Sequence, residues 1–283
     1  MSKVAVVIES TTHLPEEMSA KYKLPSPPAI IIWGEEELRD GIDIQPKEFY
    51  ERLATAKDHP STSQATPIMF KEAYEPLVAA GRDILTITIS SKLSGMYSSA
   101  VQAKKMFPDA NIEVVDSLTG ALGIVWPLQK TLEAAESGAS LRECKSIIEK
   151  CLKPIGLLLV PENLEYLYKG GRIGAASKFI GTALKFKPIL EVRDGIFQGL
   201  EKVRTYTKAL NRMIEILVEQ IDGRTPVYLC AAHANAPDAA AKLLADAEAV
   251  IESKGSYITA VSPAIGVHLG PGSVGIAFMA GID

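Results

Sequence analysis

The sequence predicts an α/β chain in two parts, and three observations lead to that fold class. In residues 1–153, apolar runs without polar alternation are separated by helical patterns, as in sheets of buried parallel strands. In residues 154–283, a strand hairpin is followed by two long helices and further strands, which indicates an α+β arrangement with a mixed or antiparallel sheet. The change of pattern at Lys153-Pro154 predicts two domains, 1–153 and 154–283.

Strands and helices alternate through the first part. Strand patterns cover residues 3–10, 28–33, 83–90 and 111–117. Helical patterns cover residues 14–22, 45–56, 68–81, 94–107, 119–138 and 140–152. This alternation predicts a mostly parallel sheet with helices on both faces.

The second part opens with a strand at 154–160. Residues 187–205 contain two strand patterns joined at Asp194-Gly195, a preferred dipeptide for a hairpin turn. Long helices are predicted at 205–222 and 236–253, and strands at 226–233, 256–262 and 273–280. Two domains in close contact leave a cleft between them, which is a common place for a ligand.

Composition favours a globular protein and excludes several classes of function. The chain is 47% hydrophobic and 23% charged, which is ample for a sizeable core. Its net charge of −4 and lack of a long basic run argue against nucleic acid or an anionic membrane as the main partner. The start does not resemble a signal peptide, and no apolar stretch reaches about 18 residues. We therefore expect a cytoplasmic protein.

The cysteines and the absent motifs exclude further classes of site. Cys144, Cys151 and Cys230 are widely spaced, which argues against a zinc site or a disulfide framework. We expect all three to be buried. The sequence also lacks the G-x-S-x-G motif of many hydrolases and the HExxH motif of zinc proteases.

Two hydroxyl-rich segments stand just before helices. Residues 89–95 (ISSKLSG) end one strand and open a helix, and residues 59–67 (HPSTSQATP) lead into another. A serine at such a junction can cap the helix. Alternatively, the junction can bind an anion, because helix N-termini present N–H donors and Gly95 allows close approach. In an open parallel sheet both junctions would meet at the edge where ligands bind.

Among the four histidines, His268 is the candidate for binding an anion, since we expect strand residues and a glycine-rich turn around it. It is either a structural histidine or a donor to a carboxylate or oxyanion. The GPGSVG sequence at 270–275 precedes a strand pattern, so it predicts a tight turn and not a dinucleotide site. The basic loop at 168–179 lacks a GK[ST] sequence and therefore is not a phosphate-binding loop.

A set of segments, collinear along nearly the whole chain, resembles the DegV family of bacterial proteins. No single motif carries the resemblance, but the set is specific in its order and spacing. The segments are VAVVIESTTHLP (4–15), ELRDGIDIQPKEFYERL (37–53), PSTSQATP (60–67), ISSKLSGMYSSA (89–100), VVDSLTGALG (114–123), LEYLYKGGRIG (164–174), KPILEVRDG (187–195), KVRTYTKAL (202–210) and HLGPGSVGIAF (268–278).

The resemblance implies a DegV-like fold, with a three-layer α/β/α domain followed by a two-layer α+β domain. It implies a carrier and not an enzyme, with no cofactor or metal, that binds a long-chain fatty acid such as palmitate, stearate or oleate. In the family, a hydroxyl of the TSQ-type loop, a serine of the SSxLSG segment and the histidine of the HxGPG segment hold the carboxylate. Here these are Thr62, Ser94 with the Gly95 backbone, and His268.

The resemblance also implies a partner. Some members present the fatty acid to a separate dihydroxyacetone-kinase-like fatty acid kinase, which phosphorylates the carboxylate to an acyl phosphate. Arg172 and Arg204, in the GGRIG and KVRT segments, are the candidates for facing that kinase. We expect only neutral donors at the carboxylate, which would leave it available as a nucleophile.

The fatty acid tail needs a dry apolar tunnel. Candidates for its wall lie in a glycine-flanked segment, although a plain core would need them equally: Phe179, Ile180, Leu184 and Phe186.

Three positions depart from the family pattern. Glu9 stands where the family's T-D-S opening has aspartate, and Ala65-Thr66 follows the TSQ segment in place of Pro-Ser or Pro-Thr. Met96 stands where threonine is frequent, and its bulk predicts a shortened or reshaped pocket.

Two other functions stay open from the residues alone. A hydrolase or acyltransferase could use Ser94 as nucleophile, His268 as base and Asp116 as the acid that orients it. A binder of a small polar anion could use the two hydroxyl-rich junctions, and it would have a polar pocket in place of an apolar one.

Overall fold

The first part of the chain folds around a parallel sheet, as predicted. The computed structural model describes residues 3–182 and 186–283. Strands β1 (Val4–Val7), β5 (Asp83–Thr88) and β6 (Ile112–Asp116) pair in parallel in the order β1-β5-β6. Every residue of β1 and β5 is buried, which agrees with the unbroken apolar runs that predicted them.

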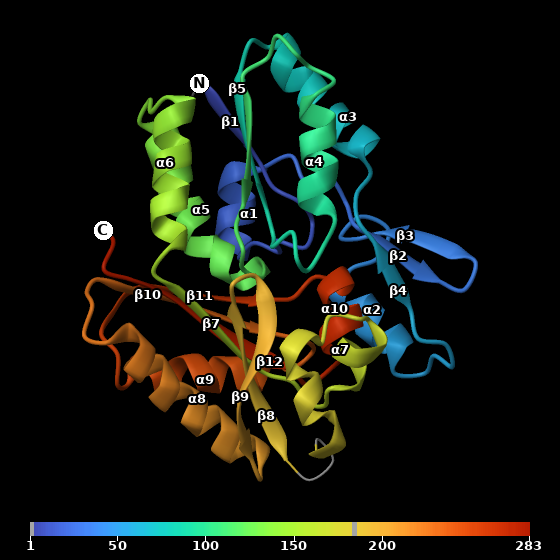
Figure 1. Ribbon diagram of the computed structural model, residues 1–283, viewed down its shortest axis with the longest axis vertical. Helices are drawn as coiled ribbons and strands as arrows, with labels where there is room; N and C mark the ends of the chain where they lie inside the picture. Colours follow the sequence, from blue (N-terminus) through green and yellow to red (C-terminus); the bar gives the residue numbers. More distant parts are fainter. Residues whose placement is uncertain (1–2, 183–185) are drawn as a thin grey trace.

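Helices cover both faces of this sheet (Figure 1). On one face lie α3 (Pro67–Ala79) and α4 (Met96–Lys104), and on the other α1 (Glu16–Tyr22), α5 (Ala121–Glu136) and α6 (Leu141–Leu152). Helix α6 begins with a capping box, in which Ser140 and Glu143 each bind the other's backbone N–H. The three-layer arrangement is therefore confirmed.

One predicted strand belongs to a different sheet. Residues 28–33 were expected in the parallel sheet, but β2 (Ile30–Trp33) pairs antiparallel with β3 (Glu36–Arg39) and β4 (Ser61–Ser63). In β2 buried and half-buried residues alternate, which suits a sheet with one covered face. The sequence concealed this alternation because all the positions of β2 are apolar. Helix α2 (Pro46–Leu53) lies between β3 and β4 in the chain.

The second part is built on a mixed sheet, also as predicted. Its strands run in the order β11-β10-β12-β7-β8-β9, and only β10 and β11 are parallel. Helices α8 (Tyr206–Ile221) and α9 (Pro237–Glu248) cover one face. The strands are β7 (Ile155–Val160), β8 (Lys187–Arg193), β9 (Ile196–Val203), β10 (Val227–His233), β11 (Ser253–Ala260) and β12 (Val274–Ala280).

The predicted hairpin turn between β8 and β9 is present. Asp194 and Gly195 both have positive φ, at 51° and 80°. This is the conformation that an Asp-Gly turn between two antiparallel strands favours.

The short helices complete the architecture. They are α7 (Glu165–Lys169), the 3₁₀ helix η1 (Gly174–Thr182) and α10 (Pro263–Leu269). His268 was expected beside strand residues, but it lies in the last turn of α10. Ser262 caps this helix and Pro263 opens it, a pair of signals that the apolar residues around them concealed.

Helix α10 connects the two parts of the chain. It packs against α2, β2 and β4, and its Ala264 and Val267 belong to the same buried cluster as Ile31 and Phe49. A second buried cluster joins α5 and α6 to Tyr228, Cys230 and Met279 of the mixed sheet. The division into domains 1–153 and 154–283 stays a prediction.

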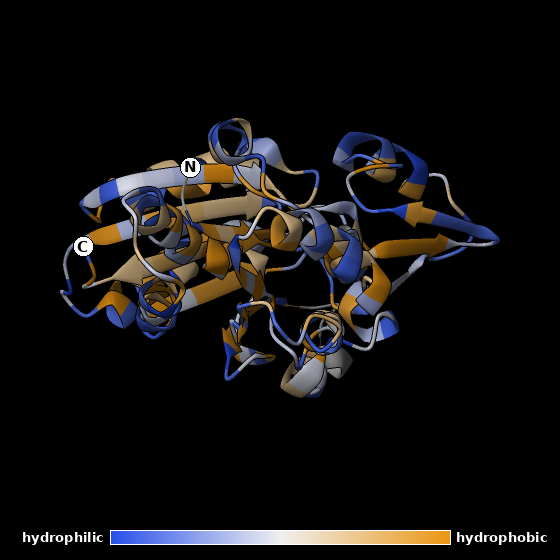
Figure 2. Cartoon of the chain, turned by 90° about the horizontal axis from the view of Figure 1, so that it is seen from above, coloured by the Kyte–Doolittle hydropathy of each residue, from blue (hydrophilic) through white to orange (hydrophobic). Residues whose placement is uncertain are grey.

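Hydropathy follows this arrangement. Figure 2 shows mostly hydrophobic strands at the centre and mixed or hydrophilic helices around them. Cys144, Cys151 and Cys230 are free and buried, as expected. In the described part of the chain, no helix has the length and apolar character needed to cross a membrane.

Candidate functional site

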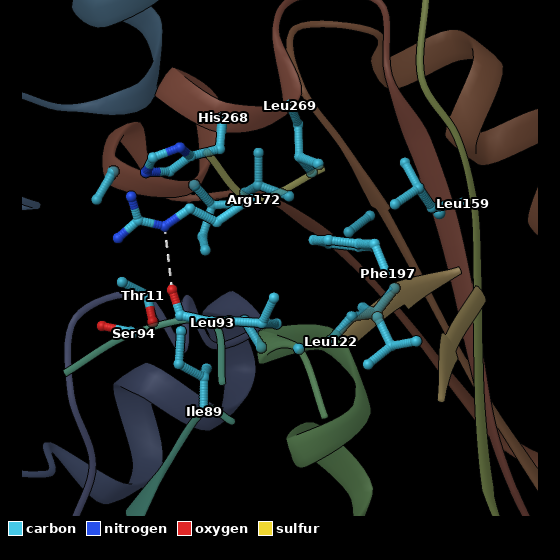
Figure 3. Close-up of a pocket in the computed structure, with 18 of the residues that line it drawn as sticks. Thr11, Ile89, Leu93, Ser94, Leu122, Leu159, Arg172, Phe197, His268 and Leu269 are labelled. Carbon is cyan, nitrogen blue, oxygen red and sulfur yellow. Dashed lines mark hydrogen bonds between the residues drawn. The ribbon is translucent and has the colours of Figure 1, made fainter. Parts of the chain in front are cut away.

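A cavity lies where the hydroxyl-rich junctions meet α10 and the mixed sheet. It has a volume of about 110 Å³, several times what one water molecule needs. Figure 3 shows that Thr11, Ser94, Arg172 and His268 gather on one side of it, whereas Leu122, Leu159 and Phe197 lie on the other. The cavity therefore has a polar end and an apolar end.

Thr62 and His268 are in direct contact at the polar end. Thr62 lies on β4 and His268 on α10, and their Oγ1 and Nε2 atoms are 2.7 Å apart. Burial, together with the nearby Arg172 and His59, lowers the pKa of His268 to about 3, so its imidazole is neutral at physiological pH. Nδ1 is buried without a partner among the described residues, so we assign the ring proton to Nε2. The imidazole then donates to Thr62 and leaves the threonine proton free for a ligand.

Arg172 lies in the wall of the cavity, and the resemblance had not placed it there. Its Nε donates to the carbonyl of Leu93 at 3.1 Å, as Figure 3 shows, and its Nη1 donates to the carbonyl of Gly170 at 2.7 Å. These two bonds fix a half-buried guanidinium at the polar end. A permanent positive charge therefore stands at the polar end, which the expectation of only neutral donors at the carboxylate did not include. Arg204 is exposed and lies outside the cavity wall.

Ser94 and Gly95 lie at the start of α4, as the sequence predicted. Ser94 lines the cavity, and its Oγ accepts a long hydrogen bond of 3.4 Å from the N–H of Met96. Its hydroxyl therefore accepts from the first N–H group of α4 and also lines the cavity. Gly95 is the N-cap residue, and a side chain there would collide with Gln64, since a Cβ atom would lie 2.8 Å from its Cδ. The backbone at Gly95 thus packs closely on the TSQ segment.

The other serines of this junction do not face the cavity. Ser90 is fully buried and donates to the carbonyl of Gly195 at 2.8 Å, which ties the β8–β9 turn to the end of β5. Ser91 is exposed, and its N–H donates to Asp116. Both serines are structural.

The residues at the apolar end of the cavity are not the ones that the sequence suggested for the tunnel wall. Phe179 is buried in the adjoining hydrophobic cluster and, like Phe186, is outside the cavity wall. Leu184 lies outside the described residues, as does the side chain of Ile180. The wall is formed by residues of α5, β7, β8, β9 and α10: Leu122, Leu157, Leu159, Val192, Phe197 and Leu269.

Two of the residues that depart from the family pattern, Glu9 and Met96, lie in the core beside the cavity. Glu9 is fully buried, and its carboxylate accepts from the N–H and hydroxyl of Thr11 and from the N–H of Ile89. Burial raises the pKa of Glu9. Met96 is fully buried in the cavity wall, and its sulfur accepts from the N–H of Ala65 at 3.3 Å. Both residues therefore position segments that line the polar end.

The arrangement does not favour a serine hydrolase. His268 binds Thr62, and among the described residues no hydrogen bond joins His268 to Ser94. Asp116 accepts from the N–H groups of Ser91 and Leu118, which caps a turn and does not orient a histidine. Within residues 3–182 and 186–283, no group of three or more His, Cys, Asp or Glu side chains could hold a metal ion.

Comparisons with known proteins agree with the fold. Residues 3–281 match the model of the family described as uncharacterised proteins of the DegV family. Protein DegV of Bacillus subtilis is 33% identical over 97% of this chain and 98% of its own length. A DegV domain-containing protein of Clostridium perfringens is 32% identical over 97% and 98%.

Solved structures give the same result. A DegV family protein of Thermus thermophilus, described for its fatty acid binding, superposes with a TM-score of 0.92 and 26% identity, covering 99% of this chain and 100% of that one. The structure of Bacillus subtilis DegV, described as a fatty acid binding protein, has a TM-score of 0.88 and 31% identity over 99% and 100%. On the family model and these relatives, this chain belongs to the DegV family.

Proposed function

We propose that this protein binds a long-chain fatty acid and presents its carboxylate to a separate fatty acid kinase. The observation that carries the proposal is the polarity of the cavity, which has hydroxyl, imidazole and guanidinium groups at one end and aliphatic and aromatic side chains at the other. The relatives from Thermus thermophilus and Bacillus subtilis, both described as binding fatty acids, support it.

The polar end meets the needs of a carboxylate. A buried carboxylate is costly unless hydrogen bonds pair it. The Thr62 and Ser94 hydroxyls and the Arg172 guanidinium line the same end of the cavity. His268 orients the Thr62 hydroxyl through the hydrogen bond between their side chains. The backbone at Gly95 also places the N-terminal end of α4 beside Ser94. One permanent charge and two neutral donors then hold the acid.

The apolar end supplies the affinity. Each buried CH₂ contributes roughly 0.8 kcal/mol, so about fifteen contribute on the order of 12 kcal/mol before the costs of binding. Leu122, Leu159 and Phe197 provide the surface that such a chain would cover. A small polar anion would leave that surface without a ligand, which favours the fatty acid.

The partner role rests on the position of the polar end. Arg172 reaches the cavity from the loop that follows α7, and Tyr168 and Lys169 at the end of that helix are exposed. A kinase that docks on this surface would meet the carboxylate end of the ligand. Arg204, exposed just before α8, is the second candidate for contact with the kinase.

The test begins with the ligand. Protein purified from a bacterial host is denatured and extracted, and the extract is analysed by mass spectrometry for a stoichiometric fatty acid. Thr62→Ala and Ser94→Ala should each weaken the binding of added palmitate or oleate, whereas the exposed Ser91→Ala should not. An empty extract together with no uptake of either acid would reject fatty acid binding.

The kinase step is tested separately. Purified loaded protein is mixed with a dihydroxyacetone-kinase-like fatty acid kinase and ATP, and acyl phosphate is measured. Arg204→Glu should lower the rate without changing fatty acid affinity. Equal rates of acyl phosphate formation with the natural protein and with Arg204→Glu would show that Arg204 does not contact the kinase.

A further inference from the structure

A polar cleft lies behind the wall that closes the apolar end of the cavity. The cleft has a volume of about 810 Å³, and polar side chains including Asp116, Thr119, Glu191 and Arg193 contribute to its wall. It reaches the surface of the protein, since the side chain of Arg193 is 58% exposed. Nothing in the proposed function uses this cleft.

Two side chains separate the cleft from the cavity. Among the described residues, Leu157 of β7 and Val192 of β8 are the residues that line both spaces. We call this pair the partition. Leu157 lies two residues before Leu159 and in the same buried cluster, and Figure 3 shows Leu159 at the apolar end, on the side away from His268 and Ser94. The end of a bound acyl chain would therefore point toward the partition.

The partition lies at the end of the paired register of β7 and β8. Strands β7 and β8 pair at Leu159 with Leu190 and at Leu158 with Glu191, and the paired register ends there. Leu157 and Val192, which would form the next pair, stand where the ladder has ended. The residue-by-residue pairing of β7 and β8 therefore does not extend to the partition.

The two side chains of the partition differ in how closely they are packed. Leu157 is buried and packs closely against Gly120, where an added Cβ atom would lie only 3.3 Å from its Cδ1. Val192 is half-buried and borders the cleft directly. A chain end that crosses the partition must therefore displace these two side chains, which can do so by a change of rotamer.

Given the proposed function, we propose a second class of ligand: long-chain acids that carry a hydroxyl at the ω end. Such an acid would place its carboxylate at Thr62 and Ser94 and pass its ω end between Leu157 and Val192 into the polar cleft. A hydroxyl enclosed in an apolar cavity without a partner would weaken binding by roughly 5- to 150-fold. In the cleft, water and the polar groups around Asp116 and Thr119 would satisfy it.

The test compares two ligands on protein freed of lipid. The ratio of dissociation constants for 16-hydroxyhexadecanoic and hexadecanoic acid should be about threefold or less. Leu157→Phe, which thickens the partition, should raise this ratio about tenfold or more. Leu158→Ala is the matched control, because Leu158 points to the opposite face of β7 and packs in the cluster under α8, so the ratio should not change.

The outcomes separate this inference from the proposed function. A ratio above tenfold in the natural protein, or a ratio that Leu157→Phe leaves unchanged, would overturn the inference while hexadecanoic acid still binds. Loss of binding for both acids would reject the proposed function itself. If Leu157→Phe does not fold, Val192→Phe thickens the same partition at its half-buried residue. The ratio of dissociation constants should then rise in the same way.

Discussion

Replacing Gly170 with alanine should weaken fatty acid binding, although the new methyl group would not contact the ligand. Gly170 has φ −75° and ψ −5°, a backbone conformation that alanine adopts without strain. A Cβ atom there would lie 2.0 Å from Nδ1 of His268 and 2.8 Å from its Cε1. The backbone carbonyl oxygen of Tyr166 would lie 3.1 Å from this Cβ atom, so the substitution acts mainly on the imidazole.

The size of the effect follows from these distances. Contacts of a Cβ atom below 3.0 Å are essentially never found, so the ring must retreat by about 1 Å from its 2.0 Å position. A shift of this size breaks the 2.7 Å hydrogen bond to Thr62 and leaves the threonine hydroxyl without its orientation. Hydrogen bonds to a charged group contribute about 1.5–3 kcal/mol, so affinity should fall by about 10- to 150-fold.

The assay is a titration of fluorescent or radiolabelled fatty acid against the single variants Gly170→Ala and His268→Ala and the double variant. If alanine acts through the imidazole, the double variant should bind as His268→Ala does, a failure of additivity that a double-mutant cycle measures. Natural affinity in folded Gly170→Ala, or additive losses in the double variant, would refute the reasoning.

Three further predictions concern stability. The pKa of His268 is about 3 in the folded protein and near 6.5 in the unfolded chain. The unfolded chain therefore binds the proton first, and the free energy of unfolding should fall as the pH drops below about 6.5. Urea titrations at several pH values should show a smaller fall for His268→Gln than for the natural protein. Trp126→Phe removes a buried 2.7 Å hydrogen bond to the carbonyl of Leu229 and should cost about 1–3 kcal/mol, seen as a lower Tm. Ser140→Ala removes the capping box of α6 and should cost about 1 kcal/mol, whereas an unchanged midpoint in urea would mean that this helix end frays in the native state.

The sequence predicted the sheets best where strands are buried on both faces or form a local hairpin. Strand β1 is apolar throughout, β5 is buried at every residue, and the β8–β9 turn has an Asp-Gly dipeptide, so the local sequence was enough to predict these elements. Strand β2 was assigned to the wrong sheet because its partners, β3 and the short β4, are polar and lack a strand pattern. Pairing between distant segments is not encoded in the local pattern.

The polar end of the cavity was partly predictable. The segments that hold Thr62, Ser94 and His268 were indicated by their junctions and by the family resemblance, and the structure brings all three to one cavity. The place of Arg172 was not predictable, because its direction depends on the carbonyl groups of Leu93 and Gly170. The apolar wall was missed, since its residues look the same as core residues until the sheet is assembled.

The packing of α10 has a consequence for how the molecule folds. Gly266 lies against the rings of Phe49 and Tyr50, so a helix near one end of the chain completes the core around β2. A fragment of residues 1–153 would expose these rings to water, and a fragment of residues 154–283 would leave α10 without its support. The chain should therefore unfold as one cooperative unit, and its many contacts between distant segments should make refolding slow compared with a helical bundle of equal stability.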